Sequence, residues 1–442
     1  MLLRFDSQLP VAAPEFLLPA TGTDLYRWSV IACDQFTSEP VYWNEAEAIV
    51  GDAPSTLRLV LPEVFLETLS ESEIEAKIAH VNASIDEYLK QGLFRTLPPG
   101  FILVDRKTSY APSRKGLMLA LDLERYDYTP GTREPIRSTE GTVLSRIPPR
   151  VRIRENASIE LPHIMVLIDD PDRTVIEPAY DALSVNAPVY DTKLMLDGGH
   201  LKGFYCKADS VVAETIVRAL TALLTHSGDG FLFAVGDGNH SLATAKTHWE
   251  NIRGNLSAEE KKLHPARFAL VEVVNIHDEG LDFEPIYRVV FGLSLNTFRQ
   301  KATRYFQENG FTLCPVAGTS SLYSNDGTQK ILVTTGSDDY LMTLSAPAHP
   351  LPVASLQMFL DEAVVGDDSL RVDYIHGEDT IRKLAGPDSI GFILPDVSKH
   401  SFFQAISDAG VFPRKTFSMG HAREKRYYLE AKMITELQKE AD

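Results

Sequence analysis

The residues of this sequence best suited to chemistry form one short segment, Gly236-Asp237-Gly238-Asn239-His240-Ser241. The apolar run 231–235 before it predicts a short buried strand, and 241–253 after it has the pattern of a helix. Free backbone N–H groups and the positive end of the helix dipole meet at such a helix start, which makes it an anion site. The segment therefore predicts a strand–turn–helix that binds phosphate.

The backbone of this 236–241 turn carries the predicted phosphate site. Gly236 and Gly238 would let the chain turn sharply and let a phosphate approach closely, and the amides from Gly238 through Asn239 to Ser241 would cradle it. The turn is not a Walker A loop. It is not a G-x-G-x-x-G fingerprint either, since Ser241 stands where the third glycine would be.

Two side chains of the turn are candidates for catalysis. Asp237 would hold a metal ion or orient a ligand hydroxyl, and His240 would donate a hydrogen bond to phosphate or act as a general acid or base. The alternative is an ordinary strand-to-helix turn, in which the glycines serve backbone geometry and His240 and Ser241 cap the helix. The local pattern leaves both interpretations open.

Two basic clusters stand out in a chain whose formal net charge is -18. Arginine forks suit carboxylate and phosphate groups, and ligands are often held on loops. For one arginine alone, a solvated charge paired with acids is the better interpretation, but each cluster as a whole predicts at least one ligand contact. The clusters are Arg133, Arg137, Arg146, Arg150, Arg152 and Arg154, and Arg414, Lys415, Arg423, Lys425 and Arg426.

Other polar segments carry weaker signals. The stretch 275–284 is rich in oxygen and imidazole ligands but matches no calcium loop and no zinc spacing, so a solvated acidic loop is favoured. His200 and His376 stand in glycine-containing turns and are interpreted as structural. No G-x-S-x-G, H-E-x-x-H or C-x-x-C motif is present. Cys33 has no sign of a reactive environment and is not nominated.

Alternating helical and strand patterns must position these residues. Strands are predicted at 57–61, 101–105, 117–121, 163–169 and 267–276, and helices at 211–225 and 427–439, with a further helix opening at 70–73 and capped by Ser72. The fold class is therefore α/β, or mixed α+β, with mixed sheets and flanking helices. The expected regions are an N-terminal 1–128, a central 129–292 that holds the arginine-rich loop and the turn, and a C-terminal 293–442 with the basic Pro-Arg-Lys-Thr segment.

Composition narrows the function classes. The acidic balance argues against nucleic acid as a partner, because such a surface repels the phosphate backbone. No run approaches the ~20 apolar residues of a membrane helix, and no signal peptide is recognised, so no membrane partner and a cytoplasmic location are expected. Cys33, Cys206 and Cys314 are too few and too widely spaced for a disulfide framework.

The turn also resembles a family signature. Residues 235–246 are similar to the D-G-H-H-R-x-x-T-A motif of a bacterial and archaeal family catalogued as domain of unknown function 1015. Further segments resemble that family in the expected order, at Cys33-Asp34, 270–275, 285–288, 373–377 and 412–418. The motif in turn resembles the phosphate-binding turn of the ParB and sulfiredoxin superfamily. That superfamily includes a nucleotide-dependent free-serine kinase, so the resemblance implies nucleotide-phosphate handling and a similar strand–turn–helix core.

This chain departs from the family pattern where Asn239 replaces the first histidine, Ser241 replaces the arginine and Tyr287 replaces a histidine. Losing that arginine removes a bidentate phosphate partner. Arg288 and Lys415 remain at matching positions.

The leading hypothesis is an enzyme that binds a phosphorylated small molecule or a nucleotide, and it would act as a kinase of a small hydroxyl compound such as serine. The expected cofactors are Mg²⁺ and ATP or ADP. Asp237, His240, Arg288 and Lys415 would be catalytic, with charge neutralisation by the last two, and Glu140 and Arg146 would contact substrate. Two alternatives remain. One is a phosphoester hydrolase, and the other is a non-catalytic ligand-binding or regulatory protein that kept the fold.

Overall fold

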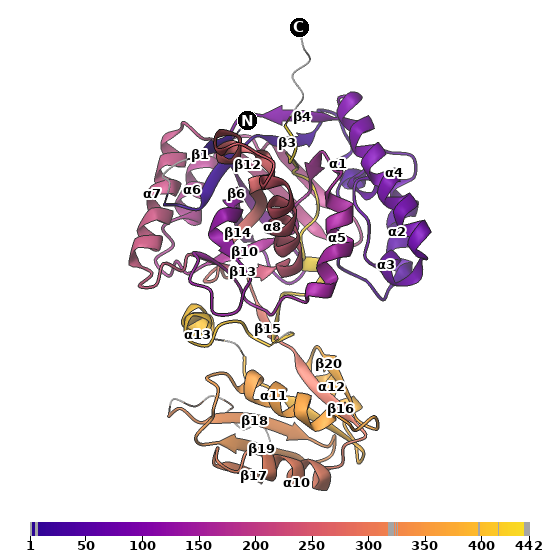
Figure 1. Ribbon diagram of the computed structural model, residues 1–442, viewed down its shortest axis with the longest axis vertical. Helices are drawn as coiled ribbons and strands as arrows, with labels where there is room; N and C mark the ends of the chain where they lie inside the picture. The colour runs from indigo at the N-terminus through magenta and orange to yellow at the C-terminus, as the bar shows by residue number, and fades with distance from the viewer. Residues whose placement is uncertain are drawn as a thin grey trace. The chain divides into compact units, whose positions relative to one another are not determined.

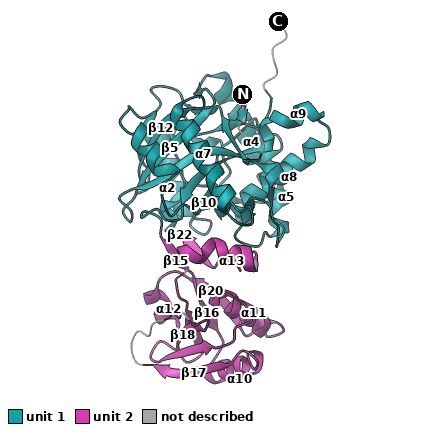
Figure 2. Cartoon of the chain, turned by 90° about the vertical axis from the view of Figure 1, so that its left-hand side faces the viewer, with its two compact units in different colours: residues 1–281, 420–442 teal, residues 282–419 magenta. Residues whose placement is uncertain are grey.

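The computed structural model describes residues 2–4, 8–316, 322, 324, 326–396, 398–413 and 415–436. The chain forms two compact units: unit 1 comprises Met1–Leu281 and Gly420–Asp442, and unit 2 comprises Asp282–Met419 (Figure 2). Helices and strands mix in both units, which confirms the α/β class. The units differ from the three expected regions, because 1–128 and 129–292 supply strands to one sheet and the end of 293–442 returns to unit 1.

Unit 1 is built on an 11-stranded mixed sheet in the order β11-β12-β5-β6-β14-β10-β13-β8-β7, with β2 on β6 and β1 on β2. Among its described strands, only β10–β14, β13–β8 and β7–β8 are parallel pairs. The strands are β1 Leu2–Arg4, β2 Val11–Pro14, β5 Gly100–Lys107, β6 Arg114–Asp122, β7 Tyr126–Asp127, β8 Ile136–Ser138, β10 Met165–Ile168, β11 Tyr190–Leu194, β12 Gly199–Lys207, β13 Phe233–Asp237 and β14 Phe268–Asn275. Two small pairs complete the unit, β3 Phe16–Pro19 with β4 Phe94–Leu97 and β9 Ile159–Glu160 with β23 Lys432–Met433.

The central strands are buried on both faces. Their sequences are therefore continuous apolar runs, without alternation of apolar and polar residues. Every residue of β14 is buried, as expected for a strand with helices and loops on both sides. This explains why the strands predicted at 101–105, 117–121, 163–169 and 267–276 are present. The strand predicted at 57–61 is wrong: the chain forms a 3₁₀ turn at Thr56–Arg58 instead, in which the Ser55 hydroxyl accepts from the Leu57 N–H at 3.2 Å.

Unit 1 also contains helices, several of which lie against its sheet (Figure 1). They are α1 Leu25–Trp28, α2 Pro40–Val50, α3 Val64–Thr68, α4 Glu71–Lys90, α5 Ile147–Arg154, α6 Ile176–Leu183, α7 Val211–His226, α8 Asn239–Arg253 and α9 Ala258–Leu263, with 3₁₀ turns at Leu123–Arg125, Leu144–Arg146, Pro265–Arg267 and Ala422–Glu424. The α4 helix begins two residues earlier than predicted, because Ser70 and Glu73 form a capping box. The α5 and α8 helices contact each other through Ile147, Val151 and Ala243.

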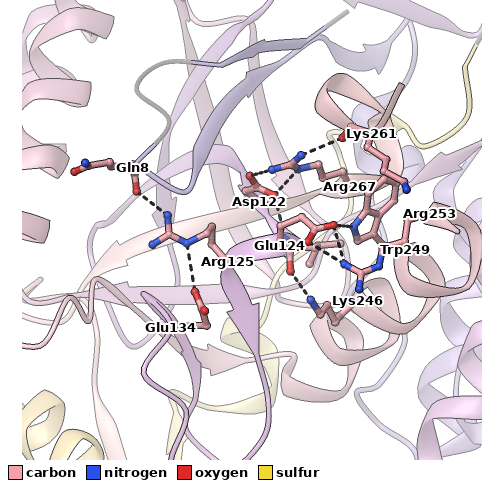
Figure 3. Close-up of polar contacts among 11 residues, drawn as sticks. Gln8, Asp122, Glu124, Arg125, Glu134, Lys246, Trp249, Arg253, Lys261 and Arg267 are labelled. Carbon is pink, nitrogen blue, oxygen red and sulfur yellow. Dashed lines mark hydrogen bonds and ion pairs between the residues drawn. The ribbon is translucent and has the colours of Figure 1, made fainter. Parts of the chain in front are cut away.

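The second half of α8 is fastened to the loop after β6 (Figure 3). The Glu124 carboxylate accepts hydrogen bonds from Trp249 Nε1 at 2.7 Å and from Arg253 at 2.9 and 3.0 Å. Lys246 Nζ donates to the Leu123 carbonyl at 2.9 Å. Next to them, both carboxylate oxygens of Asp122 accept from the Arg267 guanidinium, at 2.8 and 2.7 Å. The contacts of Lys246, Trp249 and Arg253 fix the helix whose first turn carries the predicted site.

The C-terminal segment of unit 1 is extended over its described residues 425–436 apart from local turns, so the helix predicted at 427–439 is wrong; residues 437–439 lie outside the described residues. It bonds to the N-terminal region through Leu17–Ala431 and Val30–Tyr428 backbone contacts. Its charged residues form ion pairs with each other and with the sheet. Arg426 pairs with Glu272 of β14 and with Glu430, and all three residues are at most 3% exposed. Buried partners from distant strands override the local helical pattern.

Unit 2 is an antiparallel sheet in the order β17-β19-β18-β21-β16-β20, with a separate β15–β22 pair. Its apolar core includes Val290, Phe298, Phe359 and Phe392. Its strands are β15 Phe283–Pro285, β16 Tyr287–Phe291, β17 Phe311–Val316, β18 Gln329–Thr334, β19 Asp339–Leu344, β20 Arg371–Ile375, β21 Ser389–Ile393 and β22 Phe417–Met419. Its helices are α10 Leu295–Tyr305, α11 Pro352–Val364, α12 Glu378–Leu384 and α13 Phe402–Ala409, with a 3₁₀ turn at Lys399–Ser401. In the described part of the chain, no helix combines the length and the apolarity that crossing a membrane requires.

Candidate functional site

The 236–241 turn joins β13 to α8, as the sequence predicts. Opposite β10, Val235 pairs with Val166 and Asp237 pairs with Met165, so Gly236 is the extra residue of a β-bulge. Gly238 is the N-cap of α8 with φ +79°, a left-handed conformation that glycine adopts without strain. The N-cap residue Gly238 has no side chain of its own to cap the helix. The backbone of the first turn therefore faces its surroundings without the serine, threonine or aspartate that usually closes a helix start.

Asp237 binds donors of the protein itself. Its Oδ1 accepts from the Gly238 N–H at 2.9 Å, and its Oδ2 lies 2.9 Å from Lys425 Nζ. Both oxygens thus face N–H donors, and no group of three or more metal-ligating side chains is found among the described residues. The residues present do not fit the Mg²⁺ site expected at Asp237. They place a largely buried lysine ammonium beside the turn instead.

Asn239 and His240 tie a neighbouring loop to the start of α8. The Asn239 amide is buried; its Oδ1 accepts from Thr139 N at 3.2 Å, and its Nδ2 donates to the Val235 carbonyl at 3.2 Å. The His240 Nε2 accepts from Val143 N at 3.1 Å. The Asn239 side chain therefore serves the fold, and the accepting Nε2 places the proton of the neutral His240 ring on Nδ1.

The same loop carries Glu140, which is half-buried next to this first turn. Arg146 follows at the end of the 3₁₀ turn Leu144–Arg146, and its side chain is exposed while its carbonyl accepts from Arg150 at 2.8 Å. The structure thus brings Glu140 near the turn through the backbone, whereas Arg146 faces solvent.

Ser241 belongs to a hydrogen-bonded chain of side chains that sequence reasoning missed. Its Oγ lies 2.6 Å from His163 Nε2, and His163 Nδ1 lies 2.7 Å from the Tyr428 hydroxyl. The Tyr428 hydroxyl accepts from the Cys33 N–H at 3.0 Å. Asp34 Oδ2 lies 3.8 Å from His163 Nε2. A hydroxyl, an imidazole and a carboxylate meet here at the start of a helix.

A cavity of about 140 Å³ lies beside these hydrogen-bonded side chains in unit 1. Ser241, His163 and Thr244 line one part of it, and Leu61 and Leu66 are among its apolar lining residues. Its charged lining consists of two ion pairs, Glu63 with Arg150 and Glu160 with Arg154.

Acids that line this cavity or lie beside it have shifted pKa values. Burial raises the pKa of Glu63, and the nearby Asp34 carboxylate adds to the rise, against the pull of Arg150. Burial also works to raise the pKa of Asp34, but His163, the Gln35 amide and Lys425 outweigh it and hold the pKa of that carboxyl below its usual range. Burial raises the pKa of the Cys33 thiol far above its ordinary value, which agrees with its omission as a nucleophile.

The two remaining predicted residues belong to unit 2. Arg288 is fully buried; its Nε donates to Gln357 Oε1 at 3.1 Å, and a second nitrogen donates to the Ile286 carbonyl. The Arg288 and Lys415 cations lie over the ring of Tyr374, 5.2 and 4.5 Å from its centre. The structure therefore brings these two residues together within unit 2. A cavity of about 280 Å³ in unit 2 is lined by neither of them. Arg414 lies outside the described residues.

Some residues of this site were not predicted as site residues, although the sequence contains partial signals for them. Arg150 and Lys425 belong to the two basic clusters, and Asp34 lies in a segment of the family resemblance. His163 and Tyr428 had no such signal, because they are 78 and 265 positions from their partners, Ser241 for the first and His163 for the second. Side-chain pairs at these separations are created by the sheet and cannot be read from spacing.

Comparison with known proteins identifies the family. The model of the family described as "Protein of unknown function (DUF1015)" matches residues 17–363, and the chain belongs to this family. A comparison with curated proteins found no match. Among solved structures, a free serine kinase in complex with AMP has a TM-score of 0.39 at 9% identity, over 74% of this chain and 95% of that one. SbnI from Staphylococcus aureus has a TM-score of 0.37 at 12% identity, over 74% and 90%. A conserved hypothetical protein from Pyrococcus furiosus has a TM-score of 0.34 at 10% identity, over 71% and 90%.

Proposed function

We propose that this DUF1015 protein binds a nucleotide or another phosphorylated small molecule at the 236–241 turn and transfers a phosphoryl group to a small hydroxyl compound such as serine. One observation carries the proposal: a helix start whose N-cap is a glycine lies beside a lysine ammonium and a hydroxyl–imidazole pair. Helix N–H groups and a cation bind phosphate oxygens, and an imidazole next to a hydroxyl moves protons.

The roles follow from the contacts. The first turn of α8 would hold phosphate oxygens, and Asp237 would orient the Lys425 ammonium toward them, so that the cation neutralises transferred charge. His240 would keep the 139–143 loop, and with it Glu140, against the turn. The hydroxyl acceptor would occupy the cavity of about 140 Å³. We assign no protein ligand to Mg²⁺, since both oxygens of Asp237 already accept from N–H donors.

The test is ligand-induced thermal stabilisation with ATP, ADP, phosphoserine and inorganic phosphate, each with and without Mg²⁺. A ligand at 100 times its Kd adds about 2.7 kcal/mol to the free energy of unfolding, which is a visible shift. Lys425→Gln should weaken that ligand by about tenfold or more, since it removes a charge-assisted hydrogen bond. Lys246→Gln is the matched control: it removes the same charge from the far half of α8, where Lys246 bonds to Leu123, and should leave binding unchanged.

Turnover assays then separate the reaction classes. Phosphorylation of a hydroxyl acceptor with consumption of the nucleotide supports the kinase. Phosphate release without an acceptor would favour the phosphoester hydrolase, and binding without turnover would favour the non-catalytic ligand-binding protein. The absence of a shift with every phosphorylated ligand would remove phosphate binding at this turn altogether.

A further inference from the structure

The contact between Ser241 and His163 has the geometry of an activated nucleophile. A serine hydroxyl is activated when a base lies within roughly 2.6–3.2 Å of it and a third group orients that base. Ser241 Oγ lies 2.6 Å from His163 Nε2, and Tyr428 contacts the opposite ring nitrogen at 2.7 Å. Ser241 also lines the cavity of unit 1, so its hydroxyl adjoins space that a small molecule can occupy.

The contacts of Tyr428 allow Nε2 to be the basic nitrogen of His163. Burial raises the pKa of Tyr428 well above its ordinary value, so the phenol keeps its proton. The phenol oxygen accepts from the Cys33 N–H at 3.0 Å. The oxygen is then able to accept a second hydrogen bond from His163 Nδ1–H. In this tautomer Nε2 carries a lone pair, and it faces the Ser241 hydroxyl.

A carboxylate lies close enough to His163 to stabilise the positive charge that the imidazole acquires when it is protonated. Asp34 Oδ2 lies 3.8 Å from Nε2, and the lowered pKa of Asp34 keeps this group ionised near neutral pH. An imidazolium formed by proton transfer from Ser241 would therefore be stabilised by a neighbouring negative charge.

We propose that Ser241 is a covalent nucleophile, activated by His163, which takes a phosphoryl group from the bound donor and passes it to an acceptor hydroxyl in the adjoining cavity. The choice of a phosphoryl donor rests on the proposed function, whereas the nucleophile rests on the geometry of Ser241 and His163 alone. Asp34 and Tyr428 are positioning residues in this scheme.

The step balances as follows. The Ser241 Oγ lone pair forms an Oγ–P bond while the bond from phosphorus to the nucleotide oxygen breaks, and that oxygen leaves with the electron pair. The Oγ proton goes to His163 Nε2 and from there to solvent. In the second half, His163 takes the proton of the acceptor hydroxyl, the acceptor oxygen attacks phosphorus, and the serine oxygen leaves and regains the proton from His163.

The test is labelling by an alkyl fluorophosphonate, which phosphonylates activated serines with loss of fluoride and requires no nucleotide. Intact mass and peptide mapping should place one adduct on Ser241, and Ser241→Ala should abolish it. His163→Gln should slow labelling by about 100-fold or more, within the range of lost general base catalysis. The matched control is Ser227→Ala, because the Ser227 hydroxyl donates to the Leu224 carbonyl of its own helix, and it should label at the wild-type rate.

Positioning by Tyr428 has its own readout. Tyr428→Phe removes the partner of Nδ1 and should slow labelling by about tenfold and move the midpoint of its pH profile, which a purely structural role would not do. The titratable and charged groups around His163 in this profile are Asp34, Glu63, Arg150 and Lys425.

Three outcomes would overturn the proposal: no adduct, an adduct elsewhere than Ser241, or an unchanged rate in His163→Gln. Ser241→Cys guards against misfolding of the alanine variant, because it keeps a nucleophile at this position and should react with iodoacetamide in the folded protein. Phosphate-induced thermal stabilisation of Ser241→Ala separates the two proposals. If the nucleophile proposal alone fails, this variant and the wild type are stabilised equally and neither is labelled at position 241. If phosphate binding alone fails, Ser241 is labelled although no phosphorylated ligand stabilises the protein.

Discussion

The two ends of helix α8 contrast in how their polar groups are used. At the far end, the Glu124 carboxylate accepts hydrogen bonds from Trp249 and Arg253 (Figure 3). Next to it, the Asp122 carboxylate accepts two hydrogen bonds from the Arg267 guanidinium. At the near end, the N-cap Gly238 brings no side chain to close the helix, and single contacts hold Ser241 to a histidine beside a cavity. One helix is thus held by several charged contacts at one end, whereas its other end adjoins a cavity.

The two ends differ in how many contacts hold their side chains in place. Burial opposes ionisation of Glu124, but the hydrogen bonds from Trp249 and Arg253 outweigh it and lower the pKa of that carboxyl. Groups that are satisfied in this way stabilise the fold and take no part in chemistry. A site needs groups held in place by a few contacts and still open to a ligand, and α8 supplies both because its ends lie in different surroundings.

The largest effect is expected from Asp122→Ala, next to the anchored end of α8. Asp122 is 1% exposed, and its removal leaves the Arg267 guanidinium without its bidentate partner. Breaking a buried pair costs about 3–5 kcal/mol, to be measured by urea unfolding. The control is Glu134→Ala, whose pair with Arg125 is more than a third exposed on both sides and should change stability by less than about 1 kcal/mol. Equal losses in the two variants would contradict the structural role of the Asp122–Arg267 pair.

The middle of α8 carries a pH-sensitive residue, His248. Burial, with help from the positive charge of Arg154 and against Glu160, lowers its pKa to about 4. Between the ordinary histidine pKa and about 4, the unfolded chain binds a proton that the folded chain does not, so stability falls as pH falls through this window. From pH 7 to pH 5 the loss from this group is about 2 kcal/mol.

His248→Gln should flatten this part of the stability–pH curve, measured by urea unfolding at each pH. His226→Gln is the control, because His226 is exposed near the end of α7. If the His248→Gln curve between pH 7 and 5 has the wild-type slope, the group responsible lies elsewhere.

The contrast along α8 also explains how far the sequence alone could reach. The apolar run 231–235, the glycines and the helix pattern predict the strand–turn–helix because those signals are local. The family resemblance was confirmed over residues 17–363. Local pattern failed at 427–439, where buried partners on distant strands keep the described part of the segment extended.

Side chains of the site were harder to predict than its backbone. Asn239 has a polar side chain in a turn, which suggests ligand contact, yet its amide is used to hold Thr139 and Val235. His163 stands at the start of a predicted strand, where nothing in the sequence indicates that its imidazole meets Ser241 and Tyr428. Such contacts depend on sheet order, and β10 is placed beside β13 by pairing that the sequence does not encode locally.

The smallest expected changes in stability come from replacing one glycine at each end of α8. A Cβ at Gly238 would sit at φ +79° and 3.0 Å from Ile164 Cα, so Gly238→Ala should cost about 1–2 kcal/mol and weaken phosphate binding at the turn. Gly254 has φ -59°, and no atom of the described residues would lie within 4 Å of a Cβ added there, so Gly254→Ala should stabilise by about 0.4–1 kcal/mol. Urea unfolding of both variants, with and without inorganic phosphate, measures the pair. A gain in stability for Gly238→Ala would show that the left-handed cap is not required, and the contrast between the two ends would then reduce to their side chains.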